Sequence, residues 1–208
     1  MSDAEIYFTE LSEDLPSFIL DTGFFKTKDE HRSDGEFSLP DLPYCRIVLE
    51  TLCKERLVVM PKSRQVLCTW LVGSYLLARA LTKRNQLIIM QTKREEDALS
   101  FMGRLYFMYD HLPGWIRQIR PRQMPPKENK YKIELPQQHS KIWGIPSGAD
   151  IIRSNTVSIF FSDEVNFQPE AKQSLRAAGP SLGSHGQGIW ISSANLGGLM
   201  EQLVAGKW

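Results

Sequence analysis

Short apolar runs alternate along this sequence with longer stretches in which apolar residues recur every three or four positions. The runs typical of buried strands are 57–60, 86–90, 156–161 and 188–191. Helical spacing follows the first two runs, at Trp70, Leu71, Tyr75 and Leu76 and then at Ala98, Met102, Leu105 and Tyr109. Buried apolar strands that alternate with helices indicate a mostly parallel sheet covered by helices. The pattern therefore predicts an α/β fold, with the first run in the middle of the sheet.

Two further segments predict an antiparallel strand pair. Tyr131–Leu135 and Ser140–Ile145 are strand-like, and Pro136-Gln137-Gln138-His139 between them has the composition of a turn. Upstream, Thr92 is expected to cap a helix that begins at Lys93.

Composition limits the class of protein. A length of 208 residues with 42% apolar side chains fits one globular domain. No apolar run approaches the ~20 residues of a membrane span, and no signal peptide is recognisable, so no membrane association is expected. Three cysteines without a CxxC pair or a histidine cluster indicate a reducing compartment and argue against a zinc site.

Charge is distributed unevenly along the chain. Residues 1–50 carry twelve acidic and four basic side chains, whereas residues 51–208 carry twelve and twenty-one. We expect residues 1–39 to form an acidic arm with little regular structure beyond a short helix over Leu11–Leu20, and residues 40–208 to form the main domain. The basic segment Trp115–Lys132 is interpreted as a solvated loop in preference to a nucleic-acid contact.

The polar stretch after the first strand is a candidate phosphate loop. A strand that feeds a helix through a tight loop directs backbone N–H groups at one point, which suits a phosphate. The usual motif is Gly-x-x-x-x-Gly-Lys-Ser/Thr. Here Thr69 keeps the hydroxyl that ligates Mg²⁺, but Leu67 and Cys68 replace Gly-Lys, and a lysine stands instead at Lys62. The alternative is an ordinary strand-to-helix turn with surface cations.

A second candidate motif ends the third apolar run. Asp163 and Glu164 follow the strand directly, at the edge where open α/β sheets bind ligands. Asp163 is placed to hold Mg²⁺, and Glu164 to polarise an attacking water. Ser192 and Ser193 follow the next strand and are candidates to sense a γ-phosphate. A solvated acidic turn is the alternative for the carboxylate pair.

These motifs together resemble the ATPase domain of phage large terminases over roughly residues 40–205. The matching segments occur in the same order as in that family and are Lys62-Ser63-Arg64-Gln65 through Thr69, the helix end at Leu112-Pro113, Gly148-Ala149-Asp150 with Arg153-Ser154-Asn155, Phe161-Ser162-Asp163-Glu164, and Ser192-Ser193-Ala194-Asn195. The resemblance implies a RecA-like, P-loop NTPase three-layer sandwich with a mostly parallel central sheet.

The resemblance also implies roles for individual residues. Lys62 is similar to a displaced lysine of the phosphate loop. Thr69 and Asp163 look like the Mg²⁺ pair, and Glu164 looks like the catalytic glutamate. Ser192 and Ser193 look like the stretch that couples hydrolysis to movement. The nucleotide-binding set that it implies is Lys62, Ser63, Arg64, Gln65, Val66, Leu67, Cys68, Thr69, Asp163 and Ser193.

Two arginines complete the implied catalytic set. Arg64 resembles the loop arginine that stabilises phosphate charge. Arg153 matches an arginine that reaches the nucleotide of a neighbouring subunit, and the alternative for it is a surface arginine before a buried strand.

As a function, the resemblance implies hydrolysis of ATP with Mg²⁺ to drive double-stranded DNA into a viral procapsid in the host cytoplasm. Its implied partners are the portal protein, the small terminase subunit and further copies of the chain, which form a homo-oligomeric ring. The isolated chain is expected to be a monomer. No motif matches the nuclease domain of large terminases, so we expect an ATPase domain alone. Two alternatives stay open. One is a helicase-like ATPase, which a strand-separation assay would reveal. The other is an inactive nucleotide-binding or scaffold module, which the measured binding of an ATP analogue with Mg²⁺ would separate from both ATPases.

Overall fold

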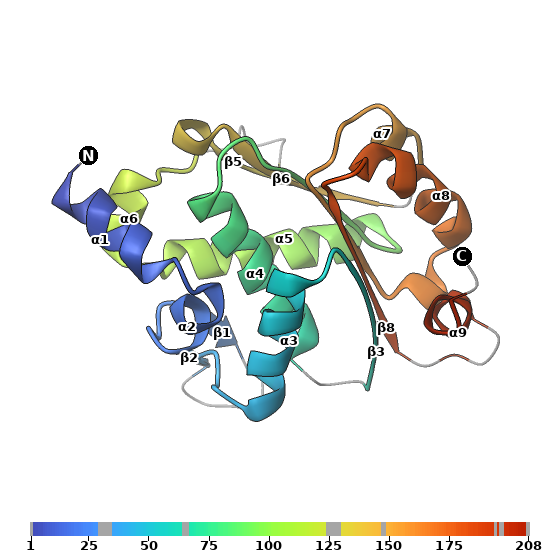
Figure 1. Ribbon diagram of the computed structural model, residues 1–208, viewed down its shortest axis with the longest axis horizontal. Helices are drawn as coiled ribbons and strands as arrows, with labels where there is room; N and C mark the ends of the chain where they lie inside the picture. Colours follow the sequence, from blue (N-terminus) through green and yellow to red (C-terminus); the bar gives the residue numbers. More distant parts are fainter. Residues whose placement is uncertain are drawn as a thin grey trace.

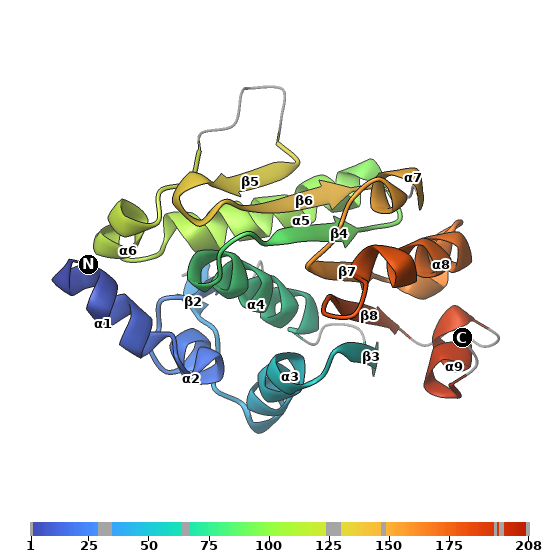
Figure 2. The same ribbon diagram turned by 45° about the horizontal axis from the view of Figure 1, so that its top comes forward.

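The computed structural model describes residues 2–28, 35–63, 67–123, 130–146, 149–193, 195 and 198–206. Within these ranges, six strands form a central sheet in the order β3-β8-β7-β4-β6-β5. Figure 1 shows the sheet between its helices, and the strand order can be followed in Figure 2. Their bounds are β3 Leu57–Lys62, β4 Leu87–Gln91, β5 Lys132–Leu135, β6 Ser140–Ile145, β7 Ile159–Asp163 and β8 Gln187–Ser193. Every neighbouring pair is parallel except β5 and β6. The predicted α/β fold with a mostly parallel sheet is confirmed.

Helices cover both faces of this sheet (Figure 2). In β4, Ile88 and Met90 belong to one hydrophobic cluster and Ile89 to another. Successive side chains of a strand point to opposite faces, so the two clusters lie on opposite sides of the sheet. The first cluster includes residues of α3 (Pro43–Lys54), α4 (Cys68–Thr82) and α5 (Glu95–Asp110), and the second includes residues of α7 (Ala149–Arg153), α8 (Ala171–Leu182) and α9 (Leu199–Val204). The result is a three-layer arrangement.

Helix α4 is enclosed on nearly all sides. Eleven of its fifteen residues are buried, because it packs against the sheet and against both α3 and α5. At Gly73 an added Cβ would lie 3.1 Å from the Cε of Met108 in α5, so the two helices approach closely there. A helix enclosed in this way is buried in the core, and its first residue, Cys68, contacts Met60 of β3.

Strand β3 differs from its prediction in place and length. The strand lies at the edge of the sheet, with β8 as its neighbour among the described strands, and not in the middle. It also continues through Pro61 and Lys62, which pair with Ser192 and Ser193. Proline has no N–H to donate, and an edge strand tolerates it. Leu57 is 48% exposed because β3 lies at the edge of the sheet.

The N-terminal segment has more regular structure than the expected acidic arm. Its elements are α1 (Asp3–Leu11), α2 (Leu15–Leu20), β1 (Lys26–Lys28) and β2 (Glu36–Ser38). The prediction of little structure is wrong because Phe8, Phe18 and Phe25 are fully buried and pack together. The Phe18 ring centroid lies 5.6 Å from that of Phe8 and 5.4 Å from that of Phe25. These rings join the cluster that contains α4 and α5.

The basic segment is not simply a solvated loop. It begins in α6 (Gly114–Ile119), and its residues 124–129 lie outside the described ranges. The Arg120 guanidinium lies 5.0 Å from the Phe8 ring centroid and donates to the Leu81 carbonyl oxygen at 3.0 Å. Burial lowers the pKa of Arg120. This cation therefore stabilises the packing of α1 and is not free to bind nucleic acid.

Two smaller expectations have different outcomes. The antiparallel pair is confirmed, with the 3-10 helix η1 (Pro136–Gln138) between β5 and β6. Thr92 does not cap α5, which begins at Glu95; its hydroxyl donates to the carbonyl oxygen of Arg94 instead.

None of the helices in the described ranges is both long enough and apolar enough to span a membrane.

Candidate active site

Three of the predicted site residues end three neighbouring strands. Lys62 ends β3, Asp163 ends β7, and Ser193 ends β8, which lies between the other two. The register places Lys62 beside Ser193 and Asp163 beside Ile191. Because parallel strands share a carboxyl edge, residues that are far apart in the sequence meet at one place, as predicted.

Lys62 is bound to Glu164. Its ammonium nitrogen lies 2.5 Å from Glu164 Oε1, and the Lys62 side chain is only 10% exposed. The lysine side chain thus reaches from the end of the edge strand β3 to the residue that follows β7. Its partner there is the candidate catalytic carboxylate.

The second oxygen of Glu164 is held by the end of β8. Oε2 accepts hydrogen bonds from Ser193 Oγ at 2.7 Å, from the Ser193 backbone N–H at 3.0 Å and from Ser192 Oγ at 3.3 Å. Burial raises the pKa of Glu164, but the hydrogen bonds from Lys62 and Ser193 outweigh it and hold the pKa below its ordinary value. Glu164 is therefore a carboxylate, placed before the 3-10 helix η2 (Val165–Phe167) with a left-handed backbone at φ 52°.

Thr69 and Asp163 also meet as predicted. The Thr69 hydroxyl donates to Asp163 Oδ2 at 3.2 Å, and Asp163 Oδ1 is buried without a hydrogen-bond partner among the described residues. Burial raises the pKa of Asp163. A buried carboxylate oxygen without a partner, next to a hydroxyl, is a donor set that suits Mg²⁺, which prefers oxygen ligands and takes one or two from protein. These residues fit the ion.

The phosphate loop is described only in part. Ser63 is exposed, whereas Arg64, Gln65 and Val66 lie outside the described ranges. Leu67 directly precedes Cys68, the first residue of α4. Cys68 is buried, and its Sγ lies 3.8 Å from Met60 Sδ. At the position of the usual lysine there is thus a thiol directed toward the core, which leaves only its backbone to face a phosphate.

Arg153 is not brought to this site within one chain. It lies at the end of α7, is 57% exposed and pairs with Asp150 at 3.0 Å. It lines a separate open hollow with Arg176 of α8. The structure therefore presents Arg153 to the outside of the molecule.

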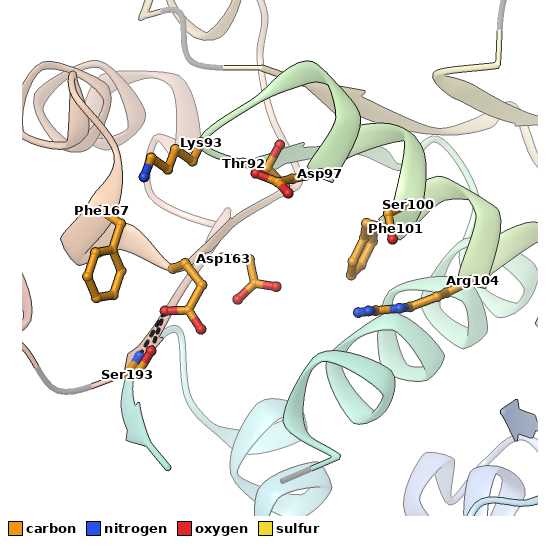
Figure 3. Close-up of a pocket in the computed structure, with 10 residues that line it drawn as sticks. Thr92, Lys93, Asp97, Ser100, Phe101, Arg104, Asp163, Phe167 and Ser193 are labelled. Atoms are coloured by element: carbon orange, nitrogen blue, oxygen red, sulfur yellow. Dashed lines mark hydrogen bonds between the residues drawn. The ribbon is translucent and has the colours of Figure 1, made fainter. Parts of the chain in front are cut away.

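A cavity of about 330 Å³ opens beside the two carboxylates (Figure 3). Its lining residues are Thr92, Lys93, Asp97, Ser100, Phe101, Arg104, Asp163, Glu164, Phe167 and Ser193. Asp97, Ser100 and Arg104, all on α5, were not predicted as site residues. Their spacing of three and four positions places them on one face of the helix, and this polar face next to the apolar stripe was the available signal.

Comparison with solved structures identifies the fold. The HK97 bacteriophage large terminase superposes with a TM-score of 0.67 at 15% identity, covering 99% of this chain and 41% of that one. A point mutant of the Thermus phage P74-26 large terminase ATPase domain gives a TM-score of 0.57 at 12% identity, covering 74% of this chain and 67% of that one. This chain has the fold of a phage large terminase ATPase domain.

A third comparison agrees with this terminase ATPase fold. The large terminase of a thermophilic bacteriophage gives a TM-score of 0.54 at 15% identity, covering 74% of this chain and 39% of that one. The chain thus spans less than half the length of this large terminase and of the HK97 large terminase. No protein-family model and no curated protein matches the sequence. The RecA-like class expected from the sequence is confirmed at the level of the fold.

Proposed function

We propose that this chain is the ATPase part of a viral large terminase, which hydrolyses ATP to drive double-stranded DNA into a procapsid. The observation that carries the proposal is the meeting of Lys62, Thr69, Asp163, Glu164 and Ser193 at one edge of the sheet. These are a cation, two hydroxyls and two carboxylates, and each carboxylate has its own hydrogen-bond partners. The terminase ATPase fold supports the same conclusion.

The two carboxylates have different tasks in this proposal. Asp163 and Thr69 would hold Mg²⁺, which when bound neutralises phosphate charge. Glu164 accepts a proton from, or orients, the attacking water, because its low pKa keeps it a carboxylate at neutral pH. Lys62 supplies positive charge to the terminal phosphate, for which it has to leave Glu164.

Ser192 and Ser193 connect this chemistry to β8. Both hydroxyls contact Glu164, and β8 lies between the strands that end in Lys62 and Asp163. A movement of Glu164 during turnover would therefore change its hydrogen bonds to Ser192 and Ser193 and shift the end of β8. This arrangement supports the proposed coupling of hydrolysis to movement.

Assembly is part of the proposal. Arg153 is exposed on α7, where it can act on the nucleotide of a neighbouring copy of the chain. The proposed assembly is a ring of copies, and the isolated chain is a monomer. Arg64 remains the proposed loop cation. Double-stranded DNA, the portal protein and the small terminase subunit are the proposed partners, and the host cytoplasm is the proposed location.

Nucleotide binding tests the proposal directly. Titration calorimetry with a non-hydrolysable ATP analogue should give Mg²⁺-dependent binding to the parent chain and none to Asp163→Asn. Phosphate release should then be measured with and without double-stranded DNA. Absence of binding by a folded parent chain would overturn the ATPase proposal.

The inactive module is the second candidate, because the buried thiol of Cys68 replaces the usual lysine. Binding without turnover in any assembled state would favour it. A strand-separation assay separates the helicase-like candidate from the packaging motor.

A further inference from the structure

Among the described residues, the expected motifs bring one cation to the candidate ATP site, Lys62. A triphosphate needs several cations around its terminal group as charge moves in the transition state. The usual loop lysine is absent, with Cys68 in its place directed toward Met60. Lys62 is engaged by Glu164. Among the described residues of the loop and strand ends, no second cation is available from the expected motifs.

Arg104 brings a cation to the site from a different element. It lies on α5 and lines the same cavity as Asp163 and Glu164. In Figure 3 its guanidinium end extends from α5 toward Asp163. The guanidinium does not bond to Asp163, whose Oδ1 has no described partner. A gap therefore separates the cation from the carboxylate.

The Arg104 side chain makes a cation–π contact with a neighbouring helix. Its guanidinium carbon lies 5.6 Å from the ring centroid of Trp70, the residue that follows Thr69 in α4. Trp70 in turn packs edge-on against Phe107, with 6.1 Å between ring centroids. A guanidinium over the face of a ring gains a cation–π attraction and keeps its N–H donors for hydrogen bonds to other groups. The cation is thus positioned relative to the proposed Mg²⁺ ligand Thr69.

The donors of Arg104 are unused in the part of the chain that the structure describes. The guanidinium makes no hydrogen bond and no ion pair there, although it is half-buried in a cavity with two carboxylates. Its charge lowers the pKa of Asp163 against the larger effect of burial. Half-buried donors that face a cavity are available for an anion, and planar N–H pairs match phosphate oxygens.

We propose that Arg104 donates hydrogen bonds to the terminal phosphate of ATP bound to the same chain, as a phosphate-contacting residue contributed by α5. This inference rests on the proposed ATPase function and adds a residue that none of the sequence motifs includes. It supplies in cis the charge that Cys68 does not. Because the contact is to the terminal phosphate, Arg104 distinguishes ATP from ADP.

Titration calorimetry with Mg²⁺ and either a non-hydrolysable ATP analogue or ADP tests the proposal on purified chain. Arg104→Gln should weaken binding of the ATP analogue by about 10- to 100-fold, the range for one charge-assisted hydrogen bond. Binding of ADP should change by less than about threefold. Arg104→Lys keeps the charge but not the planar fork, and should recover part of the affinity. Arg94→Gln, an equal charge change at the exposed start of the same helix, should match the parent.

Each other outcome has a defined meaning. Equal weakening of both nucleotides would overturn the proposal, since Arg104 would then act only by neutralising Asp163. No weakening of either would overturn it as well. If Arg104→Gln lacks the parent's circular dichroism spectrum, the comparison of Arg104→Lys with the parent decides by the same ATP-to-ADP ratio. If the parent chain binds neither nucleotide, the proposed ATPase function is overturned. If the parent binds the ATP analogue and Arg104→Gln binds it with the same affinity, only this inference is overturned.

Discussion

Lys62 and Glu164, 102 residues apart in the chain, form an ion pair of 2.5 Å at the carboxyl edge of the sheet. The cation proposed for the terminal phosphate and the carboxylate proposed for the attacking water thus neutralise one another. Under the proposed function, ATP would compete with this contact, and its binding would release both groups at once.

Removal of the lysine should therefore affect the triphosphate most. Lys62→Ala is expected to weaken an ATP analogue by about tenfold or more while ADP changes little, because a charge-assisted hydrogen bond to the terminal phosphate is lost. Calorimetry measures both affinities. Lys54→Ala is the matched control, since Lys54 is 71% exposed on α3 and pairs with Glu50. Parent-like ATP affinity in Lys62→Ala would assign phosphate binding to the loop backbone and Arg64.

Loss of the Glu164 carboxylate should lower turnover without weakening the binding of ATP. Glu164→Gln keeps an oxygen that can accept from Ser193 but cannot take a proton from water. The rate of phosphate release is expected to fall by about 10²-fold or more. ATP affinity should equal that of the parent or rise by a few-fold, because Lys62 no longer has to leave a carboxylate. Glu170→Gln at the start of α8 removes an equal charge away from the site. Undiminished turnover in Glu164→Gln would remove this residue from the mechanism.

The Asp163 carboxylate should destabilise the folded chain in the absence of Mg²⁺. Its carboxylate is buried, one oxygen has no described partner, and burial raises its pKa. Asp163→Asn removes the charge at nearly constant shape, so the melting temperature without Mg²⁺ should rise by about 2–4 °C for each 1 kcal/mol of relief. The stabilisation that Mg²⁺ and ATP give to the parent should disappear. A lower melting temperature for Asp163→Asn would mean that Thr69 and the nearby cations already compensate the charge.

Arg153 should matter only in the assembled motor. Arginines that act on a neighbour's nucleotide contribute roughly 10³–10⁵ in rate, so Arg153→Ala should abolish stimulated hydrolysis and leave nucleotide binding by the monomer unchanged. Arg176→Ala removes a second arginine from the same hollow and serves as the control. DNA packaging at the parent rate by Arg153→Ala would give the role to another residue.

Much of this site could be predicted from the sequence because its residues end strands. Lys62, Asp163 and Ser193 each follow an apolar run, and parallel strands gather such positions at one edge. The Lys62–Glu164 contact could not be predicted, since it depends on the order of strands in the sheet. Arg104 was missed because a polar helix face next to an apolar stripe has the same pattern whether it faces solvent or a cavity.

The burial of the N-terminal segment was missed for a related reason. Phe8, Phe18 and Phe25 follow no single helical or strand period, because each belongs to a different short element. Their acidic neighbours indicated a solvated arm, and only tertiary packing shows that the three rings meet.

The position of β3 has a consequence for how the chain is made. Among the described strands it pairs with β8 alone, and their partners Leu57 and Gly188 are separated by most of the chain. On the ribosome, β3 is synthesised first of the six sheet strands, and its partner β8 is synthesised last. β3 therefore has no strand to pair with until β8 has been made. Contacts of such long sequence separation form slowly and leave an apolar strand open to misassociation. The nascent polypeptide therefore cannot form the candidate site step by step. Lys62 meets Glu164 and Ser193 only when translation has passed β8.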